Sequence, residues 1–267
     1  MARLSRSGQR RSPPAALAAY VLHRYDWSES SLILDLFTRE RGRLAVAAKG
    51  AKRPYSQLRG ALLPFQRLNV SLARSVDEHS AEVQVLRGVE WAGGAPMPGG
   101  AALFAGFYLN ELLLKLLARQ DPHPALFDAY AQALPVIATA GEGAAQPALR
   151  AFELTLLRET GVLPDLGRVT PTLQPVQPQQ RYVLRPDSGV NLGAGDELAI
   201  DGRQLLALQA ALDAADGDAL RAACGAARSP LRATLRALLH YHLDSPTLRT
   251  RQVMADVQRL MDRTSHR

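Results

Sequence analysis

The stretch of residues 93–100, Gly-Gly-Ala-Pro-Met-Pro-Gly-Gly, constrains the fold of this 267-residue chain more than any other feature. Glycine and proline at this density interrupt both helices and strands, so the stretch predicts a linker. Before it, apolar and polar residues alternate as in strands, whereas after it apolar residues recur with helical spacing. The sequence therefore predicts a β domain at residues 15–92 and a helical domain at residues 101–267.

The β domain contains five candidate strands. Their spacing is mostly strand-like, and they are segments 16–23, 32–37, 44–48, 68–72 and 83–85. The longest connection, residues 50–63, lies between the third and fourth segments and is long enough for a helical turn. This plan is typical of an OB-fold, a five-stranded barrel that often binds oligonucleotides. Periodicity alone leaves an SH3-like barrel open.

The second domain is predicted to be all-α. Helical spacing is found in segments 101–119, 128–140, 146–160, 202–215, 218–227, 229–243 and 246–261. We expect Pro147 in the first turn of its helix, where proline is tolerated, and Ser229 as an N-cap. Residues 163–195 interrupt the helical pattern and predict a loop with a small hairpin.

The net charge of +7 is unevenly distributed. Residues 1–92 carry 15 Lys+Arg and 8 Asp+Glu, whereas residues 93–267 carry 17 of each. Between Arg41 and Arg74 there are eight basic residues and no acidic one. Such a patch binds a polyanion by releasing its counterions, so nucleic acid is the expected partner. The alternative is a solvated basic surface on an arginine-rich chain.

Several classes of protein can be excluded. The single cysteine, Cys224, excludes an intramolecular disulfide and suits a reducing cytoplasm. No apolar run approaches the roughly 20 residues that a membrane-spanning helix needs. Residues 1–14 contain four arginines and precede an apolar run of only eight residues. We interpret them as a disordered basic tail and not as a signal peptide.

Catalytic and metal-binding patterns were not found. Lys49-Gly50-Ala51-Lys52 lacks the spacing of a P-loop. His240 and His242 are two residues apart on a predicted helix, about 200° around its axis, so they cannot share a metal ion. Cys224 has no nearby histidine or asparagine to activate it. The sequence therefore predicts a binding protein with no catalytic residues, metal or cofactor.

The predicted nucleic-acid site follows the third strand, the loop after it and the start of the fourth strand. Arg43 and Lys49 are six residues apart on one predicted strand, so we expect both on the same face. Tyr55 and Trp27 are candidates for stacking on bases, although either could instead be a packing residue. The cations predicted to contact the phosphates, without reading base identity, are Arg43, Lys49, Lys52, Arg53, Arg59 and Arg67.

Several short segments resemble the RecO family of bacterial DNA repair proteins. In the β domain they are Trp27-Ser28-Glu29-Ser30-Ser31-Leu32, Asp35-Leu36-Phe37-Thr38, Gly42-Arg43 and Gly60-Ala61-Leu62-Leu63-Pro64-Phe65. In the helical domain they are Tyr108-Leu109-Asn110-Glu111-Leu112, Pro147-Ala148-Leu149-Arg150-Ala151-Phe152-Glu153-Leu154 and Gly202-Arg203-Gln204-Leu205-Leu206-Ala207-Leu208. The similarity is dense over residues 15–72 and recurs to about residue 210.

The resemblance implies an OB-fold followed by a helical domain, in a non-enzymatic recombination mediator that acts at the nucleoid. Such a protein binds single- and double-stranded DNA, anneals complementary strands and assists RecA loading on DNA coated with single-strand-binding protein. The implied protein partners are RecR and the acidic C-terminal tail of single-strand-binding protein. That tail needs an apolar groove beside an arginine, for which we assign Arg150. The alternative for Arg150 is an exposed helix arginine.

The sequence departs from the family at one site. Many members carry four cysteines after the segment resembling Gly161-Val162-Leu163-Pro164, whereas residues 167–172 here contain none. This resemblance implies a zinc-less member, with the loop held by packing or left mobile. An alternative function is an RNA-binding OB module fused to a helical interaction domain.

Overall fold

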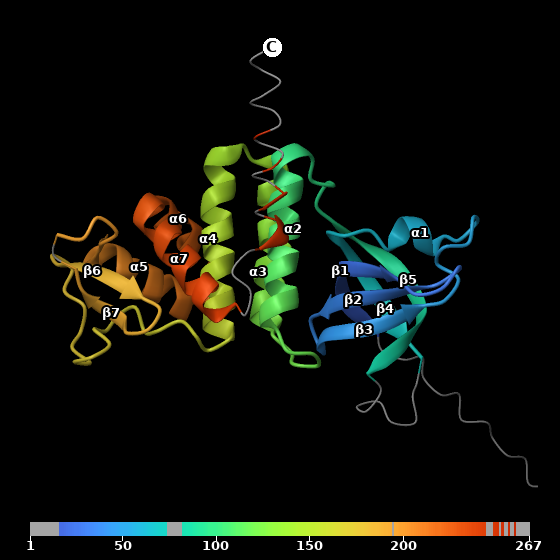
Figure 1. The fold of residues 1–267 in the computed structure, drawn as a ribbon, viewed down its shortest axis with the longest axis horizontal. Helices are drawn as coiled ribbons and strands as arrows, with labels where there is room; N and C mark the ends of the chain where they lie inside the picture. The colour runs from blue at the N-terminus through green and yellow to red at the C-terminus, as the bar shows by residue number, and fades with distance from the viewer. Residues whose placement is uncertain are drawn as a thin grey trace, which may run out of the picture.

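The computed structural model of the protein describes residues 16–73, 82–193, 195–243 and 248–250, together with residues 252, 253, 256 and 259. A β-barrel forms one end of the molecule and a small sheet lies at the other end, with helices between them (Figure 1). The predicted basic tail and most of the helix predicted at residues 246–261 lie outside the described residues.

Five strands form the barrel, closed in the order β1-β2-β3-β5-β4. They are β1 (Leu17–Asp26), β2 (Leu32–Thr38), β3 (Gly42–Ala48), β4 (Gln66–Leu72) and β5 (Val83–Gly94), with helix α1 (Leu58–Ala61) between β3 and β4. Alternate residues such as Leu34 and Val46 point inward and are fully buried. This strand order, with a helix between the third and fourth strands, is OB-like and confirms the predicted fold class.

The part of the chain after the barrel is helical, as predicted. Its helices are α2 (Gly100–Leu116), α3 (Pro124–Thr139), α4 (Glu142–Glu159), α5 (Gly202–Asp213), α6 (Gly217–Ala226) and α7 (Arg228–His242). None of the helices in the described ranges is long and apolar enough to cross a membrane.

Three helix starts differ clearly from the prediction, the first being that of α3, which begins at Pro124 and not at residue 128. Helix α4 begins at Glu142, so Pro147 lies in its second turn, where the missing N–H removes one helical hydrogen bond. Helix α7 begins at Arg228, and the N-cap residue is Ala227 with no side-chain cap, so Ser229 is not the N-cap. Helices α4 and α7 extend farther toward their N-termini than the proline positions suggested.

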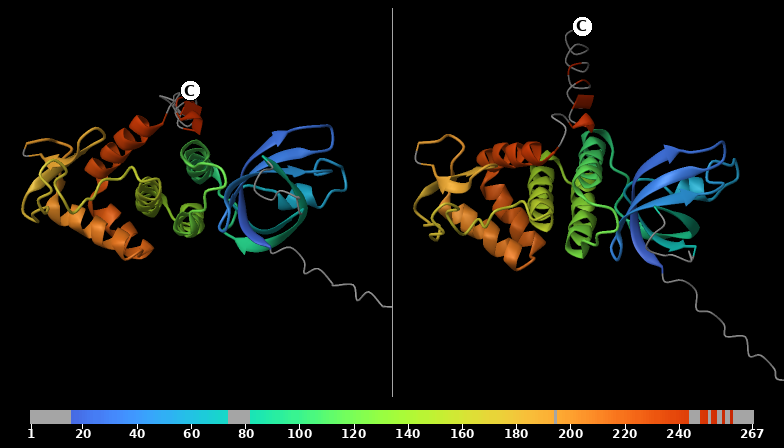
Figure 2. Two further views of the ribbon diagram at one scale, coloured as in Figure 1. Left: turned by 90° about the horizontal axis from the view of Figure 1, so that it is seen from below. Right: turned by 60° about the horizontal axis from the view of Figure 1, so that its bottom comes forward.

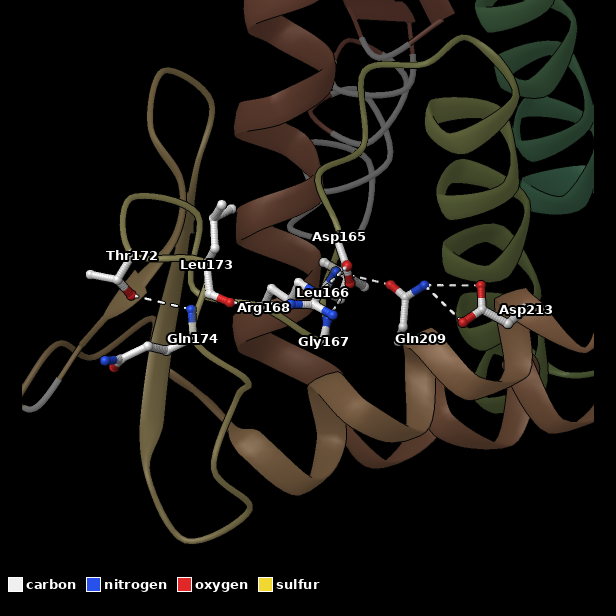
Figure 3. Close-up of polar contacts among 9 residues, drawn as sticks. All are labelled: Asp165, Leu166, Gly167, Arg168, Thr172, Leu173, Gln174, Gln209 and Asp213. Carbon is white, nitrogen blue, oxygen red and sulfur yellow. Dashed lines mark hydrogen bonds and ion pairs between the residues drawn. The ribbon is translucent and has the colours of Figure 1, made fainter.

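The loop around residues 165–174, where the resemblance led us to expect no zinc, is held by hydrogen bonds (Figure 3). The backbone N–H of Leu166 donates to Gln209 Oε1 of α5 at 2.9 Å, and the N–H of Gly167 donates to the Asp165 carboxylate at 2.8 Å. Leu166 and Val176 are buried in the helical core. The loop leads into a sheet of β6 (Arg181–Arg185), β7 (Gly189–Leu192) and β8 (Ile200–Asp201), which contains the predicted hairpin and one further strand.

One continuous apolar core joins the outer wall of the barrel to the helices. Tyr20 of β1 and Phe37 of β2 pack against Phe127 of α3, with ring centroids 5.2 and 5.4 Å apart. The amide of Asn110 in α2 donates to the Leu22 carbonyl at 3.0 Å. Figure 2 shows α2 and α3 lying between the barrel and the remaining helices. One side of the barrel is therefore covered by protein.

Candidate nucleic-acid interface

The connection between β3 and β4 presents most of the predicted cations. We call residues 49–59 the cationic loop. Lys49, Arg53 and Arg59 are exposed on it, and none of them forms an ion pair within the described residues. Tyr55, at its tip, is 99% exposed. The three cations carry their charge into solvent, where a polyanion can reach it.

Lys52 has a different role from its neighbours. Its Nζ lies 3.0 Å from an Asp26 carboxylate oxygen and donates to the Ser28 carbonyl at 3.0 Å. Its backbone N–H donates to the Ser30 carbonyl at 3.0 Å. Lys52 thus anchors the cationic loop to the β1–β2 turn, which also carries Trp27, 59% exposed. The fold places an acidic residue beside this cation, which the sequence spacing did not reveal.

Arg43, which the sequence placed in the same set, does not lie on this surface and uses its charge inside the protein. Its Nε lies 3.0 Å from Asp35 Oδ1, and its Nη1 donates to the carbonyls of Leu114 and Leu117 at the C-terminal end of α2. Burial raises the pKa of the Asp35 carboxyl, and the guanidinium groups of Arg43 and Arg119 oppose that shift. Arg43 therefore joins the barrel to the helical domain.

Arg67 is exposed on β4 but belongs to another part of the barrel wall. It is close enough to Tyr20 to lower the pKa of that phenol, against the larger effect of burial, which raises it. Because Tyr20 packs on α3, Arg67 lies near the contact with the helical domain. Of the six predicted cations, three lie together on the cationic loop, exposed and without an ion pair in the described part of the chain.

A second candidate site is a pocket of about 710 Å³ among α2, α3, α4 and α7, which we call the helical pocket. Its walls are largely apolar and include Ala105, Ile137 and Leu149. Arg232 and Arg236 of α7 also line it and are exposed. These two arginines were missed at the sequence level, although their spacing of four residues on a helix places them side by side.

Arg150 also lines the helical pocket, but it is not an exposed helix arginine. Its side chain is 9% exposed and its Nη2 lies 2.8 Å from Glu153, which is fully buried. Tyr108 donates a hydrogen bond of 2.6 Å to the same Glu153 oxygen. Much of the Arg150 charge is therefore compensated inside the protein. The charges of Arg232 and Arg236, in contrast, are accessible at the mouth of the pocket.

The described ranges contain one cysteine, Cys224, and it is buried. Burial raises the pKa of the Cys224 thiol to about 12, so it stays protonated and unreactive near neutral pH. No three histidine, cysteine or carboxylate side chains come together as metal ligands among the residues that the structure describes. The accessible charges of the cationic loop and of the helical pocket are suited to binding ligands of opposite charge.

Comparisons with known proteins give the family of this chain. A family model for the N-terminal part of recombination protein O matches residues 15–91, and one for its C-terminal part matches residues 98–252. The chain belongs to the RecO family. The DNA repair protein RecO of Verminephrobacter eiseniae is 52% identical over 244 residues, covering 91% of this chain and 96% of that protein. Those of Polaromonas naphthalenivorans and Acidovorax ebreus are 51% and 52% identical, with the same coverage.

Each of the two RecO family models covers one of the two candidate surfaces. The N-terminal model covers the cationic loop, and the C-terminal model covers the helical pocket. The names of the relatives support a role in DNA repair. Neither family description names a catalytic activity.

Proposed function

We propose that the chain is a non-enzymatic mediator of recombinational repair that binds DNA through the cationic loop, anneals complementary strands and assists RecA loading. The observation that carries this proposal is the cluster of Lys49, Arg53 and Arg59, exposed on an OB-like barrel and without an ion pair to any residue that the structure describes. Complementary strands repel each other through their phosphates, and a cationic surface that screens both lowers the cost of pairing them. The protein acts at the nucleoid, where it contacts the phosphate backbone of single- or double-stranded DNA.

An annealing assay tests this function directly. Complementary oligonucleotides coated with single-strand-binding protein should pair faster with the protein than without it. The acceleration should fall as salt rises, because counterion release weakens at high ionic strength. An unchanged annealing rate across low and moderate salt would contradict the proposal. RNA that outcompetes single-stranded DNA of the same sequence would instead favour the RNA-binding alternative.

The helical pocket suits the acidic, carboxylate-ended tail of single-strand-binding protein. A peptide of this kind places its apolar residues in a groove and its carboxylate against arginine. The pocket combines both features, with Arg232 and Arg236 at its mouth and Arg150 in its wall. We assign the main carboxylate contact to Arg232 and Arg236, and a supporting role to Arg150. RecR remains the second expected protein partner, without an assigned surface.

Replacing Arg232 and Arg236 together by alanine should weaken binding of a synthetic tail peptide by roughly tenfold or more, since charge-assisted hydrogen bonds contribute about 1.5–3 kcal/mol each. Isothermal titration with the free-acid peptide, and with the same peptide amidated at its C-terminus, measures this effect. Arg203→Ala, at an exposed arginine of α5, is the matched control and should bind normally. Equal affinity of the double variant and the control would remove these arginines from the site.

A further inference from the structure

A depression of about 640 Å³ opens on the barrel where the end of α1 meets the end of β5, and we call it the Trp91 pocket. Its lining includes Gly60, Leu63, Gln66, Trp91 and Met97. Trp91 is 67% exposed and Met97 46% exposed, although both are large apolar side chains. Neither the barrel core nor the contact with the helices accounts for this exposure.

The indole of Trp91 is held in a fixed orientation. Its Nε1–H donates to Gln66 Oε1 at 3.0 Å. The amide nitrogen of Gln66 donates in turn to the Ala95 carbonyl at 3.4 Å, so the glutamine is itself held by the backbone after β5. An aromatic ring fixed in this way loses little conformational entropy when a flat ligand stacks on it. The Trp91 pocket is therefore preorganised for a planar apolar group.

The charge next to the pocket identifies the class of ligand. Gly60 and Ala61, which line the pocket, belong to α1, and the exposed Arg59 immediately precedes them on that helix. Arg59 is the last cation of the cationic loop, so the apolar depression adjoins a phosphate-binding surface. A planar group linked to an anionic backbone matches both features, and single-stranded nucleic acid has this composition.

We propose that the Trp91 pocket receives an unpaired base of single-stranded DNA, which stacks on the indole while its phosphates contact Arg59 and the cationic loop. This inference rests on the proposed DNA-binding function and adds a basis for discriminating between strands. The bases of a duplex are already stacked and paired, so they cannot enter the pocket without unpairing. The cationic loop serves both forms of DNA, whereas the pocket adds affinity for single strands only.

Tryptophan fluorescence tests the stacking contact. The chain has two tryptophans, so Trp27→Phe leaves Trp91 as the only one, and Trp91→Phe leaves Trp27. Oligothymidine should quench the emission of the Trp27→Phe protein, whereas a duplex of equal length should leave it nearly unchanged. Oligothymidine that binds, as followed by anisotropy of a labelled strand, without changing Trp91 emission would overturn the proposal.

Two substitutions test the contribution of the pocket to affinity. Trp91→Leu should weaken oligothymidine binding by roughly tenfold and leave duplex binding within twofold, because stacking on an aromatic ring is lost. Gly60→Leu should do the same by filling the pocket without changing any charge. A Cβ at Gly60 would meet no atom within 4 Å, so the fold accommodates the added side chain. Circular dichroism melting should confirm that both variants fold.

The outcomes separate the pocket from the function on which it rests. If Trp91→Leu and Gly60→Leu both bind single strands normally while reversal of the cationic loop abolishes binding, the pocket assignment fails and the DNA-binding function stands. If reversal of the loop also leaves DNA binding intact, the proposed function fails. A selective loss of single-strand affinity in both pocket variants supports the inference.

Discussion

A protein with glutamate at positions 49, 53 and 59 is expected to bind single-stranded DNA about a hundredfold more weakly at 0.1 M salt. Each neutralised phosphate contributes a slope of about 0.7 in log K against log salt, so three lost contacts remove about two logarithmic units at this concentration. The slope itself should fall by about 2. Titration of a labelled oligonucleotide at several salt concentrations measures both quantities.

The design of this variant follows from the structure. Lys52 is left unchanged, because a glutamate there would face Asp26, 3.0 Å from the present ammonium, and would detach the loop from the β1–β2 turn. Glutamates at Arg203, Arg232 and Arg236, which are exposed and form no ion pair within the described residues, change the net charge equally on the surface of the helical domain. If this control loses as much affinity as the loop variant, general charge and not the cationic loop controls binding.

Asp35→Ala is expected to lower the free energy of unfolding by about 3–5 kcal/mol, since it leaves the buried Arg43 without its counter-charge. The two side chains are 2% and 12% exposed, so water cannot replace the lost partner fully. For a chain of this size the midpoint of thermal unfolding should fall by about 10 °C, measurable by calorimetry. DNA affinity of the folded fraction should remain, because the cationic loop is not part of this contact.

A second ion pair between the barrel and the helices can be compared with the Asp35–Arg43 pair. Arg39 of the barrel and Asp128 of α3 lie 2.9 Å apart, but their side chains are 43% and 44% exposed. Solvent and salt screen such a pair, so Asp128→Ala should change the unfolding temperature only slightly. Equal stability losses in the two variants would mean that burial does not distinguish the Asp35–Arg43 pair.

These two predictions separate cations that are neighbours in sequence but differ in role. Arg43 and Lys49 are six residues apart on and just after β3, yet the first is bound between domains and the second is exposed. Alternation along a strand predicts which face of a sheet a side chain occupies. It does not predict whether that face meets solvent or another domain, so the shared surface expected for these residues was wrong.

The sequence by itself determined the two-part architecture, the OB-like barrel and the family. The two-part architecture follows from apolar periodicity and from the positions of glycine and proline, which act on the backbone within a few residues. The family, and with it the choice of an OB-like barrel, follows from the short segments that resemble RecO proteins. The place of the cationic loop between the third and fourth strands could be read in the same way. The hairpin at β6 and β7 is another local feature that the sequence predicted.

The tertiary structure alone decided which charged and aromatic groups are available to a ligand. Arg43 meets carbonyls more than 70 residues away, and Trp91 is fixed by Gln66 from a neighbouring strand. Tyr108 of α2 donates to Glu153 of α4, the buried partner of Arg150. Arg232 and Arg236 become part of a pocket only when α7 packs beside α2, α3 and α4. The physical reason is that desolvation and ion pairing depend on distances between segments remote in sequence, which local periodicity does not contain.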